Sequence, residues 1–431
     1  MEYINSLPSD ISEININNMH LSTLPNLSTF TNLQKLNCSG NQLTEIDNLP
    51  ISLENLDCSH NYLIQLDNLP HSLQELYCSW NQLTQLNNLP HSLKVLYCLG
   101  NQLTQLDNLP SSVLVLKCSF NHLTRLDNLP ISLEILLCND NNLTQLDNLP
   151  HSLQELKCSW NQLTQLNNLP HSLKTLDCLN NQLTQLDNLP SSLLELKCSY
   201  NQLTRLDNLP LSLQILHCCN NRLTKLDNLP NSLLELYCSW NQIMQLDNLP
   251  SLQILNCSNN QLTQLDTLPS SLQILNCAEN QLTRLDNLPS SLIDLYCYNN
   301  SIIQLDNLPP SLHKLNCIYN RLTQLNNLPT SLQILYCSDN QLTKLDNIPL
   351  PLHFLDCTNN KMKNNGLGYW KEQTKNKKLQ LLKEKINARK IQKLWRKYWY
   401  DFYKYEVIDG KYIGFCRFIE RSYFIMNDNS M

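Results

Sequence analysis

The chain has 431 residues, of which 42% are hydrophobic and 16% are charged, and its formal net charge at pH 7 is −6. Residues 1–360 carry 14 Lys and Arg against 30 Asp and Glu, whereas residues 361–431 carry 17 against 7. The acidic part argues against nucleic-acid binding by most of the chain, because contacts with phosphates need Lys and Arg. The first ten residues are too polar for a signal peptide and no run of 18 apolar residues exists, so we expect a cytoplasmic protein without a transmembrane segment.

A cysteine returns every 20 residues along most of the chain, from Cys38 to Cys238 and, after one deleted residue, from Cys257 to Cys357. An asparagine follows each of these cysteines after three residues. A fixed period of this length is typical of a solenoid, in which each repeat forms one turn of a long stack. The sequence therefore predicts seventeen tandem repeats over residues 33–360.

Residues 1–32 are expected to cap the N-terminal end of the stack. They contain one degenerate repeat, in which Ile14 and Ile16 fall in register with the later repeats and Met19 replaces the asparagine. A terminal repeat is expected to be atypical because one of its faces meets solvent.

Each repeat combines a short strand with an extended return segment, as residues 33–50 illustrate. Leu36 and Cys38 alternate with polar residues, which is the pattern of a half-buried strand. Asn41 follows where the chain turns away, and its side chain can bond backbone groups that the strand leaves unpaired. Pro50 has no N–H, which excludes a ladder strand or a helix interior at the Leu-Pro segment. No repeat has room for a helix, which needs about 10 residues.

These residues resemble the leucine-rich repeat family. Its pattern LxxLxLxxNxL is met by Leu53, Leu56, Cys58, Asn61 and Leu63, with cysteine at the third site, and by the matching positions of every later repeat. The short period and the recurring Leu-Pro are most similar to the repeats of secreted bacterial effectors, and the Asn-rich, Gly-poor composition resembles that of giant-virus leucine-rich repeat proteins. The resemblance implies a right-handed β-solenoid or horseshoe with a parallel concave sheet and an extended, non-helical convex side.

The chain contains 19 cysteines, 17 of them at one inward-facing repeat position. Neighbouring thiols have parallel Cβ directions in such a ladder, which disfavours a disulfide, so we interpret them as free, small apolar core residues in a reducing compartment. No CxxC pair is present, and a column of single thiols cannot surround a zinc ion. Cys219 stands next to Cys218 and is expected to point outward.

Two more columns of polar side chains recur in the return segments. An aspartate column runs from Asp47 to Asp346, and each Asp-Asn pair is interpreted as bonding turn backbone rather than calcium, because no Gly-containing calcium loop is present. Histidines follow Leu-Pro in four repeats at a position that other repeats fill with Ser, Ile, Asn or Leu, so a variable surface position is favoured over a metal site. These histidines are His71, His91, His151 and His171. We predict no metal, no cofactor and no catalytic residue.

The residues that flank the core leucine of each strand vary, whereas most other positions of the repeat hardly change. Variation confined to one face of a rigid scaffold is typical of a recognition surface, and aromatic side chains are typical hot spots of binding. Drift on a solvent-exposed face is the alternative explanation. The predicted partner-binding residues are Tyr77, Trp80, Tyr97, Trp160, Tyr200, Tyr237, Trp240, Tyr296 and Tyr336.

The repeats stop at Asn360, and the composition of residues 361–368 indicates a linker. Residues 369–431 are predicted to form a basic amphipathic helix and a β-hairpin. Three roles stay open for this short α+β segment: a cap on the last repeat, a helix that binds a calmodulin-like protein, or a surface for an anionic membrane or nucleic acid. The second role rests on a resemblance of residues 391–396 to the start of an IQ motif. Its candidate tail-binding residues are Ile391, Gln392, Trp395 and Arg396.

The sequence therefore predicts a non-enzymatic scaffold that binds a protein partner, of unknown identity, on the concave face of the solenoid. The alternative is a structural or decoy repeat protein whose basic C-terminal helix binds a calmodulin-like protein or an anionic surface. We expect the protein in the cytoplasm, which is the host cytoplasm if the chain is viral.

Overall fold

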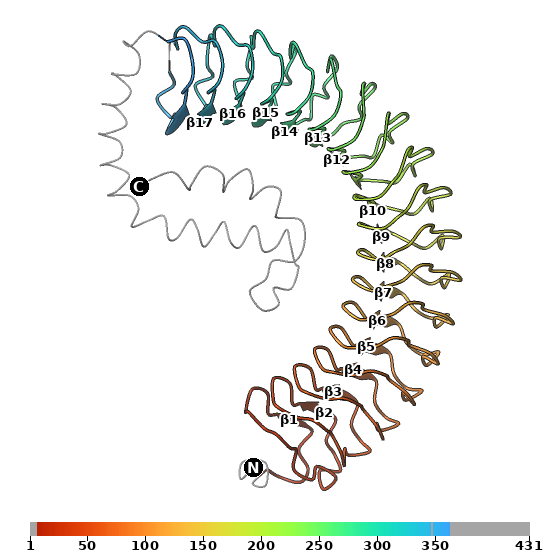
Figure 1. The fold of residues 1–431 in the computed structure, drawn as a ribbon. Coiled ribbons are helices and arrows are strands. Elements are labelled where there is room, and N and C mark those ends of the chain that lie inside the picture. Colours follow the sequence, from red (N-terminus) through yellow and green to blue (C-terminus); the bar gives the residue numbers. More distant parts are fainter. Residues whose placement is uncertain (1–6, 346–347, 363–431) are drawn as a thin grey trace, which may run out of the picture. The chain divides into compact units, whose positions relative to one another are not determined.

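The computed structural model describes residues 7–345 and 348–362. In this part of the chain, short parallel strands form one continuous sheet, and each strand pairs with the next one along the sequence (Figure 1). Equivalent repeat positions face each other, so that Leu56 is the partner of Leu36 and of Leu76. The described residues contain no helix, and hence none that could cross a membrane. The predicted parallel β-solenoid is confirmed.

The strands share one length of three residues, and in β1–β17 the middle residue is buried, whereas in β18, the last described strand, it is only partly buried. They are β1 (Glu13–Asn15), β2 (Lys35–Asn37), β3 (Asn55–Asp57), β4 (Glu75–Tyr77), β5 (Val95–Tyr97), β6 (Val115–Lys117), β7 (Ile135–Leu137), β8 (Glu155–Lys157), β9 (Thr175–Asp177), β10 (Glu195–Lys197), β11 (Ile215–His217), β12 (Glu235–Tyr237), β13 (Ile254–Asn256), β14 (Ile274–Asn276), β15 (Asp294–Tyr296), β16 (Lys314–Asn316), β17 (Ile334–Tyr336) and β18 (Phe354–Asp356).

Within residues 7–362 the strands line the inner side of a curve, and the Leu-Pro segments run along its outer side (Figure 1). The core lies between these two sides. Leu56, Cys58 and Leu63 of one repeat have no exposed surface, and the same holds for Leu76, Cys78 and Leu83 of the next. Because burial of one leucine side chain stabilises the fold by about 1.5–3 kcal/mol, this repeated column is the main source of stability.

The asparagine of each repeat ties that repeat to the one before it. The Asn61 amide donates to the carbonyl oxygens of Cys58 and Cys38, both at 3.1 Å. Its Oδ1 accepts the backbone N–H of Leu43 at 2.9 Å. One buried side chain therefore satisfies three backbone groups of two repeats, as the sequence suggested for the turn after the strand.

A second ladder, formed by serines, runs along the outer turns and was not predicted. Ser72 Oγ donates to the carbonyl oxygens of Leu53 and Ile51, both at 2.7 Å. The turn itself is closed by the N–H of Leu73, which donates to the carbonyl oxygen of Pro70. In most repeats a serine two residues after Pro thus ties the outer turn to the preceding one, as the asparagine does for the inner turn; in the last described repeat Pro351 stands at this position.

The one-residue deletion lies in an outer turn, as the sequence indicated. Leu252 donates its N–H to the carbonyl oxygen of Pro250 at 2.7 Å, so this turn closes over two residues rather than three. The strands on either side keep their register, with Leu236 opposite Leu255. The deletion is absorbed where no strand hydrogen bond depends on it.

The first repeat pairs with the second although it lacks the ladder asparagine. Ile14 of β1 is the strand partner of Leu36 in β2. Met19 occupies the ladder position and is exposed, while its N–H donates to Oδ1 of Asn41 at 3.0 Å. The first repeat therefore receives a ladder bond from its neighbour without supplying an asparagine of its own.

Candidate functional site

The predicted partner-binding residues fall into two sets in the structure. Five tyrosines project from the strands on the concave face: Tyr77, Tyr97, Tyr237, Tyr296 and Tyr336. The other four lie in the loops that follow the strands, three residues after the last strand residue: Trp80, Trp160, Tyr200 and Trp240. The tyrosines therefore lie on the surface of the sheet, whereas the other four residues lie beside it, in the loops that follow the strands. We call these loop positions the loop-edge row.

The N-terminal part of the concave face carries an aromatic cluster. The rings of Tyr77 and Tyr97 meet edge to face with centroids 4.9 Å apart. The ammonium of Lys117 lies 4.2 Å from the centroid of the Tyr97 ring. Tyr77 donates its hydroxyl to Glu75 at 2.8 Å, and burial together with this bond raises the pKa of Tyr77 above its usual value. Adjacent strands therefore hold these side chains in a fixed arrangement.

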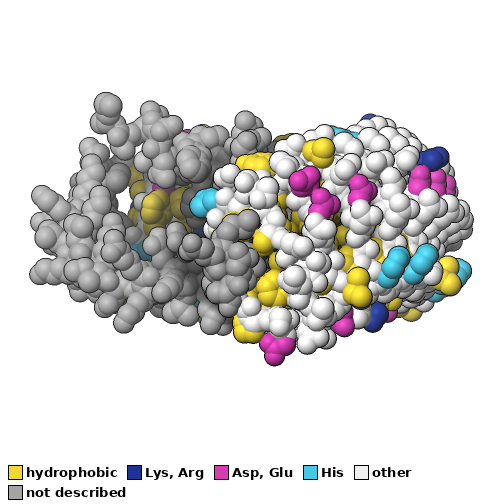
Figure 2. All heavy atoms as spheres, turned by 90° about the horizontal axis from the view of Figure 1, so that it is seen from below, with side chains coloured by type: hydrophobic (Ala, Val, Ile, Leu, Met, Phe, Trp, Pro, Cys, Tyr) yellow, Lys and Arg dark blue, Asp and Glu magenta, His cyan; other side chains and the backbone are white. Residues whose placement is uncertain are grey.

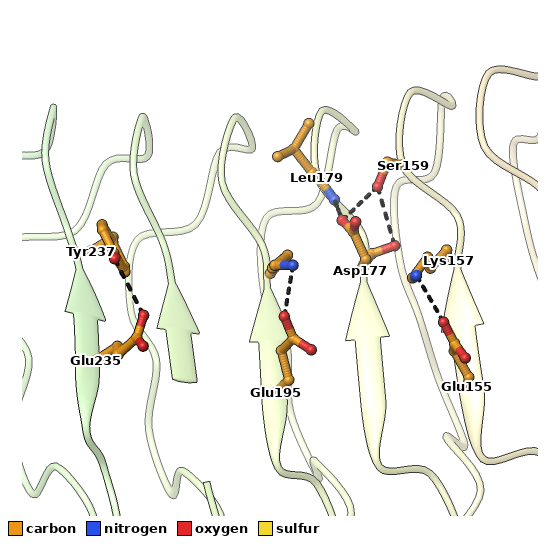
Figure 3. A network of polar contacts seen from close by, with 9 residues as sticks. Glu155, Lys157, Ser159, Asp177, Leu179, Glu195, Glu235 and Tyr237 are labelled. Atoms are coloured by element: carbon orange, nitrogen blue, oxygen red, sulfur yellow. Dashed lines mark hydrogen bonds and ion pairs between the residues drawn. The ribbon is translucent and has the colours of Figure 1, made fainter. Parts of the chain in front are cut away.

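The middle of the concave face carries a network of charged side chains (Figure 3). Lys157 pairs with Glu155 at 2.8 Å and Lys197 pairs with Glu195 at 2.6 Å. Between them, Asp177 is buried and accepts hydrogen bonds from the Ser159 hydroxyl at 2.5 Å and from the Leu179 N–H at 3.2 Å. Burial raises the pKa of Asp177, and the bond from Ser159 and the two lysines counteract this.

The C-terminal half continues with further ring contacts. His217 packs on Tyr237 with centroids 4.3 Å apart, and burial lowers the pKa of His217 to about 3. The ammonium of Lys314 lies 4.9 Å from the Tyr296 ring centroid. Tyr336 and Phe354 meet at 4.7 Å. The aromatic positions found in the sequence thus lie in separate groups along the face, with the charged network between the first group and the second.

The loop-edge row consists of aromatic residues that recur in every second repeat: Trp80, Phe120, Trp160, Tyr200 and Trp240. Each has a left-handed backbone with φ between 54° and 57°, a conformation that suits Gly and Asn and is unusual for bulky residues. Other repeats fill the same position with Gly100, Asn180 or Asn220. Gly and Asn at this repeat position are the sequence signal for a left-handed backbone, and the sequence analysis overlooked it.

Two predictions about polar columns need correction. No described aspartate of the column that begins at Asp47 bonds a turn backbone group; where a basic residue stands two positions earlier, it pairs with that residue instead, as Arg125 does with Asp127 at 3.3 Å. The following asparagines have left-handed φ values of 50° to 60° in nearly all repeats, which explains the Asn preference. Cys219 is buried, at 8% exposed, rather than outward-facing; it occupies the column of Ser199, whose hydroxyl oxygen accepts the Cys219 backbone N–H at 3.0 Å.

The described cysteines are all free thiols. Burial raises their pKa values, for example that of Cys98 to about 12. A thiol with a raised pKa is a poor nucleophile and a poor metal ligand at neutral pH. Within the described ranges, no group of three or more His, Cys, Asp or Glu side chains could hold a metal ion.

The face shown in Figure 2 carries no large cluster of charged side chains among the described residues. On the face shown in Figure 2, acidic, basic and histidine side chains stand singly or in small groups among uncharged atoms. The four outer-turn histidines are exposed, and the carbonyl oxygen of His71 accepts the Ser92 hydroxyl. Residues 363–368 of the predicted linker, the basic segment and the IQ-like residues Ile391, Gln392, Trp395 and Arg396 lie outside the described residues.

No protein-family model matches the sequence, and the comparison with curated proteins gives no match. Solved structures do match. YopM from Yersinia enterocolitica WA-314 shares 34% identity at a TM-score of 0.68, over 82% of this chain and 88% of that one. YopM of Yersinia pestis, a leucine-rich effector protein, shares 32% identity at a TM-score of 0.52, over 80% and 88%. The functional domain of InlJ from Listeria monocytogenes, which includes a cysteine ladder, shares 26% identity at a TM-score of 0.58, over 75% and 71%.

Proposed function

Because the chain belongs to the leucine-rich repeat proteins, we propose that it is a non-enzymatic scaffold that binds a protein partner on the concave face of strands β4–β17. The observation that carries this proposal is the contrast between the core and that face. The middle residue of these strands is always leucine, whereas the flanking residues include tyrosine, lysine, glutamate and isoleucine. A rigid backbone with a variable surface is the arrangement that solenoids use to recognise partners.

The composition of the face favours a protein partner. Tyrosines held by neighbouring side chains, such as Tyr77 and Tyr97, lose little conformational entropy on binding and are typical hot spots. The charged network around Asp177 gives the centre of the face a defined pattern of charge, which contributes specificity. The strands repeat at about 4.8 Å, so these features are spread over a length that suits a protein surface rather than a small molecule.

The location we propose is a reducing compartment such as the cytoplasm. Every described cysteine is a free thiol, and a chain with so many cysteines is at risk of disulfide formation in an oxidising compartment. Alkylation of the protein in intact cells, followed by mass spectrometry of its Cys peptides, tests this proposal. Recovery of disulfide-linked peptides from freshly trapped protein would contradict it.

Site-specific photo-crosslinking of the full-length protein tests the concave face. A photoreactive residue is placed at Tyr97 on the face, or at Ile131 in an outer turn, where the side chain is 84% exposed. We expect the Tyr97 variant to capture one recurring protein that the Ile131 variant does not capture. Equal yields of the same product from both positions would exclude a specific concave-face interaction.

A matched set of substitutions gives an independent measurement. The triple variant Tyr77→Ala, Tyr97→Ala and Tyr237→Ala should lose the captured protein, while Ile51→Ser, Ile131→Ser and Leu211→Ser in the outer turns should keep it. All six side chains lie at the surface or on its edge, so both variants should fold.

A further inference from the structure

The loop-edge row carries conformational strain that the solenoid does not require. Trp160 has a φ of 56°, which costs an L-residue about 1–2 kcal/mol compared with glycine. Gly100 and Asn180 hold the same position in other repeats with φ values of 63° and 52°, so the fold accepts small or polar residues there. Strained side chains that the fold does not need are found at functional sites more often than elsewhere.

Trp160 differs from Trp80 in what surrounds its ring. The Trp80 ring stacks on His60 with centroids 6.2 Å apart and contacts Phe120 at 5.9 Å. It also lies directly on Gly100. The Trp160 side chain is 44% exposed and lines an open groove of about 390 Å³. The neighbouring repeats place Asp140 on one side of it and Asn180 on the other.

The groove offers one negative charge and several acceptors. Asp140 lines it, and no basic side chain in the described part of the chain forms an ion pair with this carboxylate. Burial raises the pKa of Asp140 to about 6, as expected for a carboxylate without a compensating cation. Gln162 donates its amide to Asn142 at 3.5 Å, which leaves the Gln162 carbonyl oxygen as an acceptor. His122 completes this side of the groove.

We propose that this groove binds an arginine side chain of a protein partner, with the guanidinium stacked on Trp160 and paired with Asp140. The proposal goes beyond the concave-face function, since the groove lies in the loops that follow the strands. A guanidinium is planar, stacks on indole rings and donates hydrogen bonds in pairs to a carboxylate. Charge complementarity is also favourable at longer range, because residues 1–360 carry 30 acidic and 14 basic residues.

The test is a calorimetric titration of the full-length protein with the peptide acetyl-Gly-Ser-Arg-Gly-Ser-amide. The matched ligand contains citrulline, which keeps the planar shape of arginine and lacks its charge. We expect the arginine peptide to bind at least tenfold more tightly than the citrulline peptide. Equal affinities, or no binding of the arginine peptide at millimolar concentration, would overturn the proposal.

Two substitutions locate the site without threatening the fold. Asp140→Asn removes the charge and Trp160→Asn removes the ring, and Asn180 shows that asparagine accepts the left-handed backbone at this position. Each variant should weaken arginine binding at least tenfold, whereas Trp240→Asn should leave it unchanged. Unchanged affinity in Asp140→Asn would refute the ion pair. Binding of chitohexaose that is lost in Trp160→Asn and kept in Asp140→Asn would show that the groove is a carbohydrate site instead.

The chain also offers a gain-of-function control. Trp240 is 45% exposed, and Asn220 stands where Trp160 has Asp140. Asn220→Asp should therefore add a second arginine site, and the measured stoichiometry should rise from one peptide to two. An unchanged stoichiometry would contradict the role given to the carboxylate. The Tyr77→Ala and Tyr97→Ala variants should bind the peptide like the native protein, so the two proposals can fail separately.

Discussion

The indole of Trp80 lies so close to Gly100 in the next repeat that a Cβ atom on Gly100 would come within 2.5 Å of its Cε3. Gly100 also has a φ of 63°, where an L-residue is strained. The repeat scaffold is thus adapted locally to a bulky side chain in the loop-edge row. The two effects, contact and backbone strain, can be separated by substitution.

Gly100→Ala should destabilise the repeats around residue 100 by about 2–3 kcal/mol, since it adds both a clash and backbone strain. The measurement is hydrogen exchange of the amides in these repeats, because a long repeat array need not unfold in one step. The double variant Trp80→Asn and Gly100→Ala should recover the part that is due to the clash. If the double variant is no more stable than Gly100→Ala, the ring does not limit the space at Gly100.

Asn161→Ala should cost about 2–4 kcal/mol, because it leaves several buried backbone groups without a partner. The Asn161 side chain accepts the N–H of Leu143 at 2.9 Å and donates to the carbonyl oxygens of Cys138 and Cys158 at 3.0 and 3.1 Å. The control is Asn142→Ala, at an exposed position beside the ladder, with an expected effect below about 0.5 kcal/mol. Urea unfolding monitored by circular dichroism compares the two, and similar midpoints would contradict the ladder's role.

The backbone fold was predictable because each constant position has one physical task. Leu56 and Cys58 mark a strand by their alternation, and Asn61 marks the turn that needs side-chain hydrogen bonds. The prediction holds even for the deletion near Pro250, since an outer turn can shorten without changing strand register. The serine ladder was equally visible as a residue that recurs two positions after Pro in most repeats, and it was overlooked because serine is common in any turn.

The candidate site was predictable only in part. The variable columns identify Tyr77 and Tyr97, but their ring contact depends on how two neighbouring strands place them. The burial of Asp177 depends on the two lysines and the serine around it, and no pattern in one repeat reveals that. The sequence identified Trp160 as an aromatic candidate but did not predict its left-handed backbone. This conformation is unusual for tryptophan and is set by the repeat position rather than by the residue type.

Cys357 should be the first thiol of the solenoid to react with a labelling reagent. Its pKa is also raised by burial, but it is only partly buried at the last described repeat, whereas the column thiols before it are buried. In a Cys416→Ser background, Ellman's reagent at pH 8 should modify one thiol rapidly and the others only as the protein unfolds. As a control, Cys357→Ser should abolish the fast phase. Rapid reaction of several thiols in the folded protein would contradict the prediction and mean that the core opens readily.

Asp140→Asn should stabilise the protein at pH 7 by about 1 kcal/mol, the solvent exposure of the group limiting the gain. The folded state raises the pKa of Asp140 from 3.8 to about 6 by burial, so it binds the proton more tightly than the unfolded chain. The native carboxyl therefore costs stability as the pH rises from about 4 to 6. Urea midpoints of both proteins at pH 4 and pH 7 check this, and a stabilisation that is equal at both values would exclude the carboxyl as the cause. If Asp140→Asn both stabilises the fold and abolishes arginine binding, the Asp140 carboxylate serves binding at the expense of stability.

His217→Phe should remove part of the acid sensitivity of the solenoid. Burial, with a smaller effect from Lys197, lowers the pKa of His217 from 6.5 to about 3 in the folded state. The unfolded chain therefore binds the proton more readily, and the stability present above pH 6.5 is lost as the pH falls toward 3. Between pH 7 and pH 5 the loss amounts to about 2 kcal/mol. Phenylalanine keeps the ring contact with Tyr237 and does not titrate, so the variant should lose less stability than the native protein over this interval. The urea midpoints of the two proteins are compared across the pH range, and parallel curves would show that His217 is not buried in its neutral form.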